Sequence, residues 1–248
     1  MTAPMTAPLT ALPLILLAPS EEKASGGAKG RLVESPAQRW VRERLVALAK
    51  TGTPDQLRKA FDVKDLALDK ARSEALALAG AVPLLPALAR YTGVAFQALD
   101  AASLPPSVWP QVYILSNLRG LVRGDETVPP YKLKLGAIPG LKGHWRKALA
   151  TSLEALPEGP VWELLPGDSA DLLKGWARPR HSVEIFDARG KAISHFSKKY
   201  RGLVARWILT HQQGDPRRVL KGRIPGCHWE GLGENEQGGL TLRLVVEP

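Results

Sequence analysis

Four short apolar runs, separated by segments with helical periodicity, constrain the fold of this chain more than any other feature. The runs cover residues 14–17, 112–115, 161–165 and 240–246, and each has the length of a buried strand rather than of a buried helix. Several segments between them place apolar residues on one face, as amphipathic helices do. Because 248 residues with 44% hydrophobic content suffice for a core, we predict one compact α+β domain, with a mixed β-sheet and surrounding helices.

Helix start signals stand at two places in the first half. Ser35-Pro36 combines a capping residue with a proline in the first turn. Thr53-Pro54 is followed by Gln56 in the capping-box position. The second pattern breaks at residues 62–65 and resumes over residues 66–79, so we predict a helical hairpin, similar to a helix-hairpin-helix, near residues 53–78. Pro83 and Pro86 are expected to bound another helical piece that ends near Tyr91.

The second half is predicted to contain more strands. Residues 182–186 and 192–196 flank a turn sequence at residues 187–190, which indicates a β-hairpin. Residues 202–212 have the spacing of an amphipathic helix. Residues 231–239 are expected to be a glycine-rich loop before the last strand.

The N-terminus and the hydropathy pattern bear on localisation. We expect residues 1–12 to be a flexible tail and residues 13–248 to form the domain. No Lys or Arg precedes the first apolar run, so the charged region of a secretory signal is missing. No segment is apolar for long enough to span a membrane. A single cysteine, Cys227, excludes a disulfide within the chain and fits a reducing compartment. We therefore expect a cytoplasmic protein.

Positive charge is concentrated in one part of the chain. Residues 174–223 hold 13 Lys and Arg against 3 Asp and Glu, while the formal charge of the whole chain is +10, so the entire excess lies in this stretch. Concentrated positive charge attracts polyanions, because neutralising phosphates releases their counterions. A solvated basic face is the alternative interpretation.

The common catalytic and metal-binding motifs are missing. Ser20 and Lys23 have the Ser-x-x-Lys spacing of serine acyl enzymes, but the Ser-Asp-Asn and Lys-Thr-Gly partners are lacking. Ser20 and Lys23 follow a predicted strand, where they would either hold an anion or cap the next element. There is no phosphate-binding glycine motif, and no histidine has local metal-ligand spacing. We expect no cofactor, no metal site and no catalytic residue of a known class.

Two basic clusters are candidates for phosphate binding. Residues 198–202 read Lys-Lys-Tyr-Arg-Gly, with Arg206 four positions after Gly202. Gly202 would let backbone amides approach an anion at a helix start; a solvated turn is the alternative. The predicted hairpin carries Arg58, Lys59, Lys64, Lys70 and Arg72. Its turn lacks a Gly-x-Gly sequence, so the alternative to DNA recognition is that the hairpin only packs against the rest of the protein.

Five segments, in order, resemble one known family. They are Leu14-Ile15-Leu16-Leu17-Ala18-Pro19-Ser20-Glu21-Glu22-Lys23, then residues 91–100, 114–123 and 130–133, and finally residues 193–202 with Arg206. In these segments the chain resembles the YaaA-type peroxide-stress proteins of bacteria. The resemblance covers residues 13–210.

The resemblance implies a cytosolic protein that contributes to survival of hydrogen peroxide. It implies non-specific binding to duplex DNA through a helix-hairpin-helix element and a central basic cleft, and a role in limiting iron-dependent oxidative damage. The expected phosphate contacts are Lys198, Lys199, Arg201 and Arg206 in the cleft, with Lys59, Lys64, Lys70 and Arg72 on the hairpin.

An enzyme that acts on a small anionic or nucleotide substrate is the alternative function. Its pocket would bring together polar residues that are scattered along the chain. These residues are Ser20, Lys23, Tyr131, Lys132, Trp145, Ser169, Lys198 and Arg206. The sequence identifies no nucleophile for this alternative. Direct sequestration of iron is disfavoured, because ferrous sites use His and carboxylate ligands and no such spacing occurs here.

Overall fold

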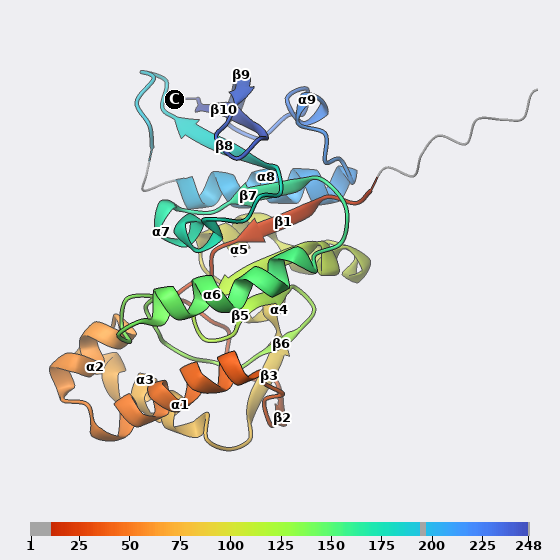
Figure 1. Cartoon of the computed structure of the whole chain (residues 1–248). Helices are drawn as coiled ribbons and strands as arrows, with labels where there is room; N and C mark the ends of the chain where they lie inside the picture. Colours follow the sequence, from red (N-terminus) through yellow and green to blue (C-terminus); the bar gives the residue numbers. More distant parts are fainter. Residues whose placement is uncertain (1–10, 194–196, 248) are drawn as a thin grey trace, which may run out of the picture.

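A seven-stranded mixed sheet forms the centre of the computed structural model, which describes residues 11–193 and 197–247. Figure 1 shows the first strand in the middle of the molecule, with the helices of residues 36–77 toward one end and the last three strands toward the other. The strands follow the order β5 (Gly120–Arg123), β4 (Val112–Ser116), β1 (Leu14–Leu17), β7 (Val161–Leu164), β8 (Arg180–Phe186), β10 (Leu240–Val246) and β9 (Cys227–Glu234).

Strand β1 organises the sheet. It pairs in parallel with β4 on one side and β7 on the other, with Leu16 opposite both Tyr113 and Glu163. All four of its residues are buried, as expected for a parallel strand that is covered on both faces. The parallel arrangement continues through β8 and β10, and antiparallel β5 and β9 close the edges. The four predicted apolar strands are confirmed.

Helices α1 (Pro36–Thr51), α2 (Pro54–Phe61) and α3 (Asp65–Ala77) pack on one another. The capping boxes predicted from the sequence are present. Ser35 and Gln38 exchange hydrogen bonds at the start of α1, and Thr53 and Gln56 do so at the start of α2. Each cap satisfies amide groups that a helix start leaves unpaired. Asp62, with a φ of 54°, ends α2.

The remaining helices connect the strands and cover the sheet. They are α4 (Ala87–Arg90), α5 (Val94–Leu99), α6 (Leu141–Glu154), α7 (Gly167–Ala170), α8 (Ser197–His211) and α9 (Pro216–Val219), with 3₁₀ turns at Ala101–Ser103, Pro106–Gln111 and Asp171–Leu173. Helix α6 packs on β5 and α1, while α5 packs on α8. Within the described ranges, no helix combines the length and apolar character needed to cross a membrane.

A small second sheet corrects one prediction. Its strands, in order, are β2 (Ala28–Gly30), β3 (Val82–Pro86) and β6 (Thr127–Val128). The segment from Pro83 to Pro86 is therefore a strand, and the helix begins only after it. Proline fixes φ near a value that an extended strand also accepts, and here the pairing of Pro83 with Lys29 decides the conformation.

Two predictions near the C-terminal end also change. The expected glycine-rich loop is shorter, because β9 continues through Gly231 and Gly233 to Glu234 and pairs with β10. The predicted hairpin after β8 is present as a turn and a bridge between Phe186 and Ala192, but residues 194–196 lie outside the described residues. The expected tail falls almost wholly in residues 1–10, which also lie outside them, so it stays a prediction.

Arg90 is a fully buried cation that joins the small sheet to the loop after β1. Its Nε donates to the carbonyl of Val128 at 3.0 Å, and Nη2 donates to the carbonyls of Gly26 at 2.9 Å and Pro83 at 3.1 Å. Nη1 donates to the carbonyl of Ala24. These carbonyls compensate for the loss of water that burial imposes on the guanidinium. Burial lowers the pKa of Arg90 from its ordinary value.

Replacing this guanidinium tests its structural role. We expect Arg90→Met to lower the free energy of unfolding by about 3 kcal/mol or more, because the carbonyls stay buried and lose their donors. Urea unfolding followed by circular dichroism measures the change. Arg39→Met, at an exposed position of α1, is the matched control and should change stability by less than about 0.5 kcal/mol. Equal losses in the two variants would contradict this role.

Candidate functional site

A pocket of about 490 Å³ opens where three parallel strands end. Its lining includes Leu17 at the end of β1, Asn117 just after β4 and Leu164 at the end of β7. In open sheets with parallel strands, ligands bind in the crevice beyond the carboxyl ends of the strands, where the strand order reverses. The chain passes from β1 to β4 on one side and returns to β7 on the other, so this pocket lies at such a reversal.

The pocket brings together most of the polar residues proposed from the sequence for a small-ligand site. They come from the loop after β1, the segment after β6, helix α7 and helix α8. No short-range spacing joins these segments, so folding alone assembles them. The lining residues from that predicted set are Ser20, Lys23, Tyr131, Lys132, Ser169 and Lys198. Arg201, which was predicted as a DNA phosphate contact, also lines the pocket.

The loop after β1 is held in place by its own polar groups. The Ser20 hydroxyl donates to the carbonyl of Glu22 at 2.6 Å, and the Lys23 Nζ donates to the carbonyl of Ser20 at 2.8 Å. Gly93 lies against this turn, where an added Cβ would stand 2.6 Å from the Cβ of Ser20. Ser20 therefore shapes the turn that presents Lys23 to the pocket.

Lys23 is the most perturbed cation of the pocket. Its Nζ lies 4.0 Å from the ring centroid of Tyr131 and 5.2 Å from that of Tyr91. Burial, followed by repulsion from Lys132, lowers the pKa of Lys23 to about 7. At neutral pH this side chain is therefore divided between ammonium and free amine.

Three hydroxyl groups form a buried chain below the Lys23 ammonium. The Tyr131 hydroxyl lies 3.0 Å from the Tyr91 hydroxyl and 2.9 Å from the Ser116 hydroxyl. Burial raises the pKa of both phenols, so both keep their protons at neutral pH. Of the two phenols, only Tyr131 lines the pocket and can contact a ligand, and neither phenol can act as a base there.

The basic cluster at residues 198–201 lies inside the first turn of α8, and not in a turn before a helix. This turn contains no acidic residue, although a helix N-terminus carries a partial positive charge that repels cations. Lys198 and Arg201 line the pocket, and neither has an ion-pair partner among the described residues. Gly202 packs instead of exposing amides, because an added Cβ would stand 2.1 Å from the Ala95 carbonyl oxygen.

Lys199, Arg206 and Trp145 are among the predicted residues that lie outside the pocket lining. Lys199 is exposed, and its Nζ lies 5.8 Å from the ring centroid of Tyr200. Arg206 ties α8 to the end of α5, with Nη1 donating to the Leu99 carbonyl at 3.0 Å and pairing with Asp100 at 3.3 Å. Trp145 is buried and supports the rim indirectly, because its Nε1 donates to the Asn117 carbonyl at 2.9 Å.

Helices α2 and α3 carry balanced charge, with five basic and five acidic residues over positions 54–77. Arg58 is held between Asp55 and Asp65. Arg72 donates to the carbonyls of Ala49 and Lys50 at the end of α1. The exposed cations that have no ion pair among the described residues are Lys59, Lys64 and Lys70.

Several pocket residues were missed from the sequence. Asn117 lines the pocket, and Tyr91 contacts the lining residue Tyr131 through its hydroxyl. Both residues belong to segments that carry the family resemblance, which was the signal available for them. Phe61 and Asp168 also line the pocket, but nothing local distinguishes them. Their contribution arises from the packing of α2 and α7 around the ends of the strands.

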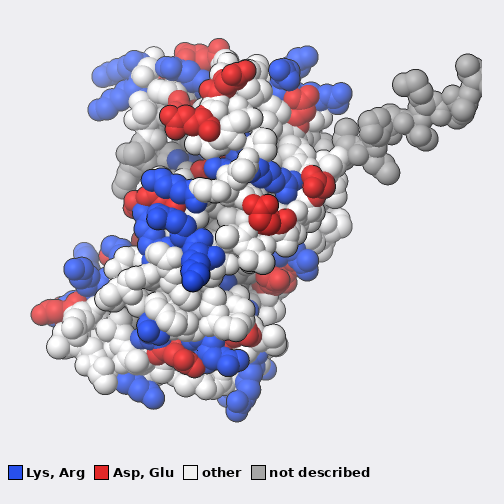
Figure 2. Space-filling model, in the orientation of Figure 1, with Lys and Arg blue, Asp and Glu red and all other residues white. Residues whose placement is uncertain are grey.

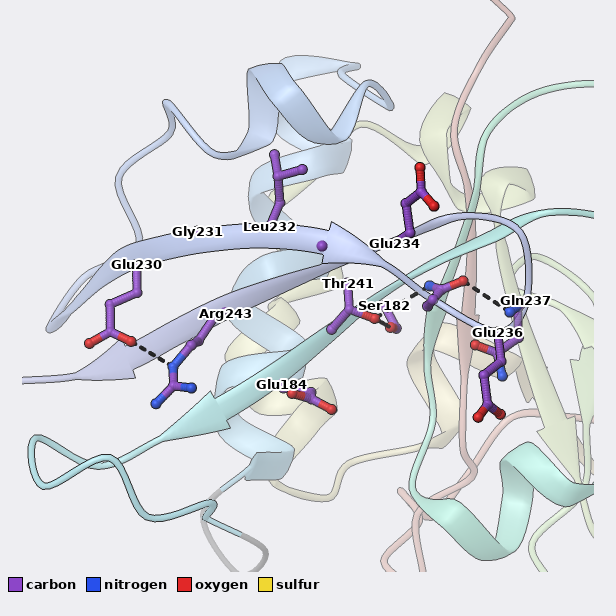
Figure 3. A pocket seen from close by; sticks show the side chains of 12 residues that line it. Ser182, Glu184, Glu230, Gly231, Leu232, Glu234, Glu236, Gln237, Thr241 and Arg243 are labelled. Carbon is purple, nitrogen blue, oxygen red and sulfur yellow. Dashed lines mark hydrogen bonds and ion pairs between the residues drawn. The ribbon is translucent and has the colours of Figure 1, made fainter.

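A second hollow, of about 730 Å³, lies on the polar face of β8, β10 and β9. Figure 3 shows Arg243 turned toward Glu230, to which it is paired at 2.5 Å, and Ser182 beside Thr241. The lining also includes Glu184, Glu234 and Glu236. Its acidic character opposes anion binding, and none of the predicted site residues lies there.

Among residues 11–193 and 197–247, no group of three or more His, Cys, Asp or Glu side chains is placed to hold a metal ion. The sole cysteine, Cys227, is half-buried in β9, and burial raises the pKa of its thiol to about 11.

Comparisons with known proteins agree on one family. The family model described as "Peroxide stress protein YaaA" matches residues 14–230. A UPF0246 protein of Corynebacterium efficiens is 32% identical, over 94% of this chain and the whole of that protein. A UPF0246 protein of Streptomyces coelicolor is 32% identical over 79% of this chain and 83% of its own length.

A more distant relative shows similar coverage. An uncharacterized protein of Campylobacter jejuni is 29% identical over 94% of this chain and 98% of its own length. The family match spans every element that contributes to the pocket, from β1 to α8. The chain therefore belongs to the YaaA family of peroxide stress proteins.

Proposed function

We propose that the pocket at the ends of β1, β4 and β7 binds a small anionic substrate, a nucleotide or another phosphate-bearing metabolite. The strongest supporting observation is that polar residues from distant parts of the sequence line the same pocket. Ser20, Lys23 and Lys198, with the other polar residues of the set, come from separate segments and line one cavity. Packing alone does not require polar groups to meet at the reversal point of a sheet.

The charges of the pocket are arranged by depth. Three of its cations, Lys23, Lys132 and Arg201, are half-buried, whereas Lys134, Lys198 and all of its carboxylates are exposed. The carboxylates are Glu21, Glu22, Asp62 and Asp168. Asp62 is paired with Lys134 at 2.7 Å. A ligand that enters the cavity therefore meets positive charge at depth, where water screens it least.

The first turn of α8 supports the same conclusion. Placing Lys198 and Arg201 at a helix N-terminus disfavours the helix by itself. An anion in the pocket reverses this effect, because it interacts favourably with both cations and with the helix dipole. Phe61, Phe96 and Leu133 supply the apolar part of the lining, which is the usual composition of a small-ligand site.

Thermal unfolding tests this proposal. We expect a nucleoside monophosphate to raise the melting temperature, and the corresponding nucleoside to have little effect, because the phosphate carries the recognition. Ligand at 100 times its dissociation constant stabilises by about 2.7 kcal/mol. Lys198→Ala should weaken binding by about 10-fold, as expected for loss of a charge-assisted hydrogen bond.

The neighbouring lysine gives the matched control. Lys199→Ala removes the same charge from the same turn but lies outside the pocket lining, so it should bind as the unaltered chain does. The proposal fails if no phosphate-bearing ligand shifts the melting temperature of the unaltered chain. It also fails if the two variants lose affinity equally.

Binding of duplex DNA is the second candidate function. We propose that Lys59, Lys64 and Lys70 contact phosphates from the hairpin formed by α2 and α3, with Lys198 and Lys199 on a basic cleft. The supporting observation is that the three hairpin lysines are exposed and without ion pairs among the described residues. Such contacts give affinity without sequence preference. By covering DNA in the cytoplasm, the protein would limit iron-dependent oxidative damage.

The salt dependence of DNA binding tests this second candidate. Replacing Lys59, Lys64 and Lys70 together by Ala should reduce the slope of log affinity against log salt by up to about 2.7, since each phosphate contact contributes about 0.9. The control replaces Arg217, Arg218 and Lys221, in and just after α9, which lies at the other end of the molecule (Figure 1). An equal fall in slope for both variants would contradict a site on α2 and α3.

A further inference from the structure

We propose that Lys23 forms a covalent imine with the carbonyl carbon of an aldehyde or ketone group on the small anionic substrate. This inference rests on the proposed function, since it assigns a reactive group to the same pocket. It names the substrate class more narrowly, as a phosphate-bearing or otherwise anionic carbonyl compound. No other lysine that lines the pocket combines the same placement and surroundings.

The placement of the Lys23 amine suits attack on a bound ligand. Lys23 lines the cavity, and the position of its Nζ is fixed by the hydrogen bond to the Ser20 carbonyl at 2.8 Å. Among the described residues, no carboxylate forms an ion pair with it. A neutral amine that donates one N–H to Ser20 keeps its lone pair available for a ligand on the pocket side.

The surrounding groups set the fraction of amine. Burial and the positive charges of Lys132 and Arg90 favour the neutral form, while Glu74 and Glu21 favour the ammonium. The ring face of Tyr131 also favours the ammonium. Burial and the two positive charges outweigh the groups that favour the ammonium, so the pKa of Lys23 falls to about 7. A substantial fraction of the molecules then carries the amine at pH 7, against about one in 2,500 for an ordinary lysine.

The reaction needs no oxidant or reductant. The Nζ lone pair forms a C–N bond, and the π electrons of the carbonyl move to its oxygen, which takes up a proton. The carbinolamine then loses water as the C=N bond forms, and the proton on nitrogen returns to solvent. Tyr131 lines the pocket, and burial raises the pKa of its hydroxyl, which is hydrogen-bonded to Ser116, so Tyr131 is the protonated hydroxyl of the lining that can orient the carbinolamine oxygen.

The positive charge of Lys132 is predicted to set the reactivity of Lys23. Lys132→Met should raise the pKa of Lys23 toward its ordinary value, because a nearby like charge no longer disfavours the ammonium. Nuclear magnetic resonance titration of lysine labelled at Cε measures this pKa. Lys134→Met is the control, since Lys134 also lines the pocket but is paired with Asp62. A Lys23 pKa that does not rise in Lys132→Met would show that Lys132 has no such effect.

Reductive trapping tests the imine itself. The unaltered chain is incubated at pH 7 with pyridoxal 5′-phosphate, an aldehyde with a phosphate monoester, then reduced with borohydride, and the modified lysines are mapped by peptide mass spectrometry. We expect Lys23 to be modified at least about 10-fold faster than exposed Lys59 and Lys64, since a larger fraction of it is free amine. Lys23→Met should remove that adduct and leave the others unchanged.

Pyridoxal without the phosphate separates this inference from the proposed function. If Lys23 reacts fastest with both aldehydes and the phosphate gives no advantage, the amine is reactive and anion recognition by the pocket is contradicted. If nucleoside monophosphates stabilise the protein but Lys23 reacts no faster than Lys59, the imine is overturned and the anion site stands. Because mapping is done on the unaltered chain, the test does not depend on the folding of a variant.

Discussion

The parallel pairing of β1 with β4 and β7 is the constraint on which the rest of this structure depends. Leu14–Leu17 is buried at every position, so β1 must lie between neighbours on both edges and layers on both faces. Parallel strands all end at the same edge of a sheet. The segments that follow β1, β4 and β7 therefore meet there, and they bring Ser20, Asn117 and Ser169 into one cavity. The site follows from the topology of the strands.

A buried cation fixes the loop that carries the reactive lysine. Arg90 holds the carbonyls of Ala24 and Gly26, and the amide of Ala24 donates back to the Arg90 carbonyl at 2.8 Å. Lys23 and Tyr91 form a backbone bridge at the same place. Consequently the Lys23 amine and the Tyr91 phenol are positioned by a contact outside the pocket. The buried guanidinium is stable there only because several carbonyls accept hydrogen bonds from it. Since some of these carbonyls belong to the small sheet and others to the loop after β1, Arg90 links the small sheet to the site.

Local patterns predicted the parts of the fold that local interactions determine. The buried strands and the capping boxes at Ser35 and Thr53 are of this kind, since each depends on a few consecutive residues. The strand at Pro83 and the continuation of β9 through Gly231 were missed, because pairing with distant strands overrides the tendency of proline and glycine to interrupt. For the site, the polar residues themselves were predicted from the sequence. Their convergence in one pocket depends on the order of the strands in the sheet, which the spacing of residues along the sequence does not show. Trp145 and Arg206 lie outside the pocket lining, and their side chains donate to the carbonyls of Asn117 and Leu99.

The distribution of charge shows why a count along the sequence is a poor guide to function here. Figure 2 shows Lys and Arg side chains gathered over α7 and the nearby end of α6, yet Lys142 and Lys174 are both paired with Asp171. In the basic stretch, Arg178 donates to carbonyls and Arg180 is paired with Glu163 at 2.9 Å. Part of the apparent excess, including Lys174, Arg178 and Arg180, is thus committed to structure.

The cations that remain differ in accessibility, and this difference separates the two candidate functions. The phosphates of a duplex can reach exposed lysines such as Lys59, but a rigid double helix cannot follow a cavity to its half-buried groups. Lys23, Lys132 and Arg201 are half-buried and line that cavity, so only a small ligand can contact all of them. Holding cations away from water lowers the stability of the free protein. A bound anion restores the lost interaction, and for this reason the interior of the pocket favours a small-molecule function over a role in DNA binding alone.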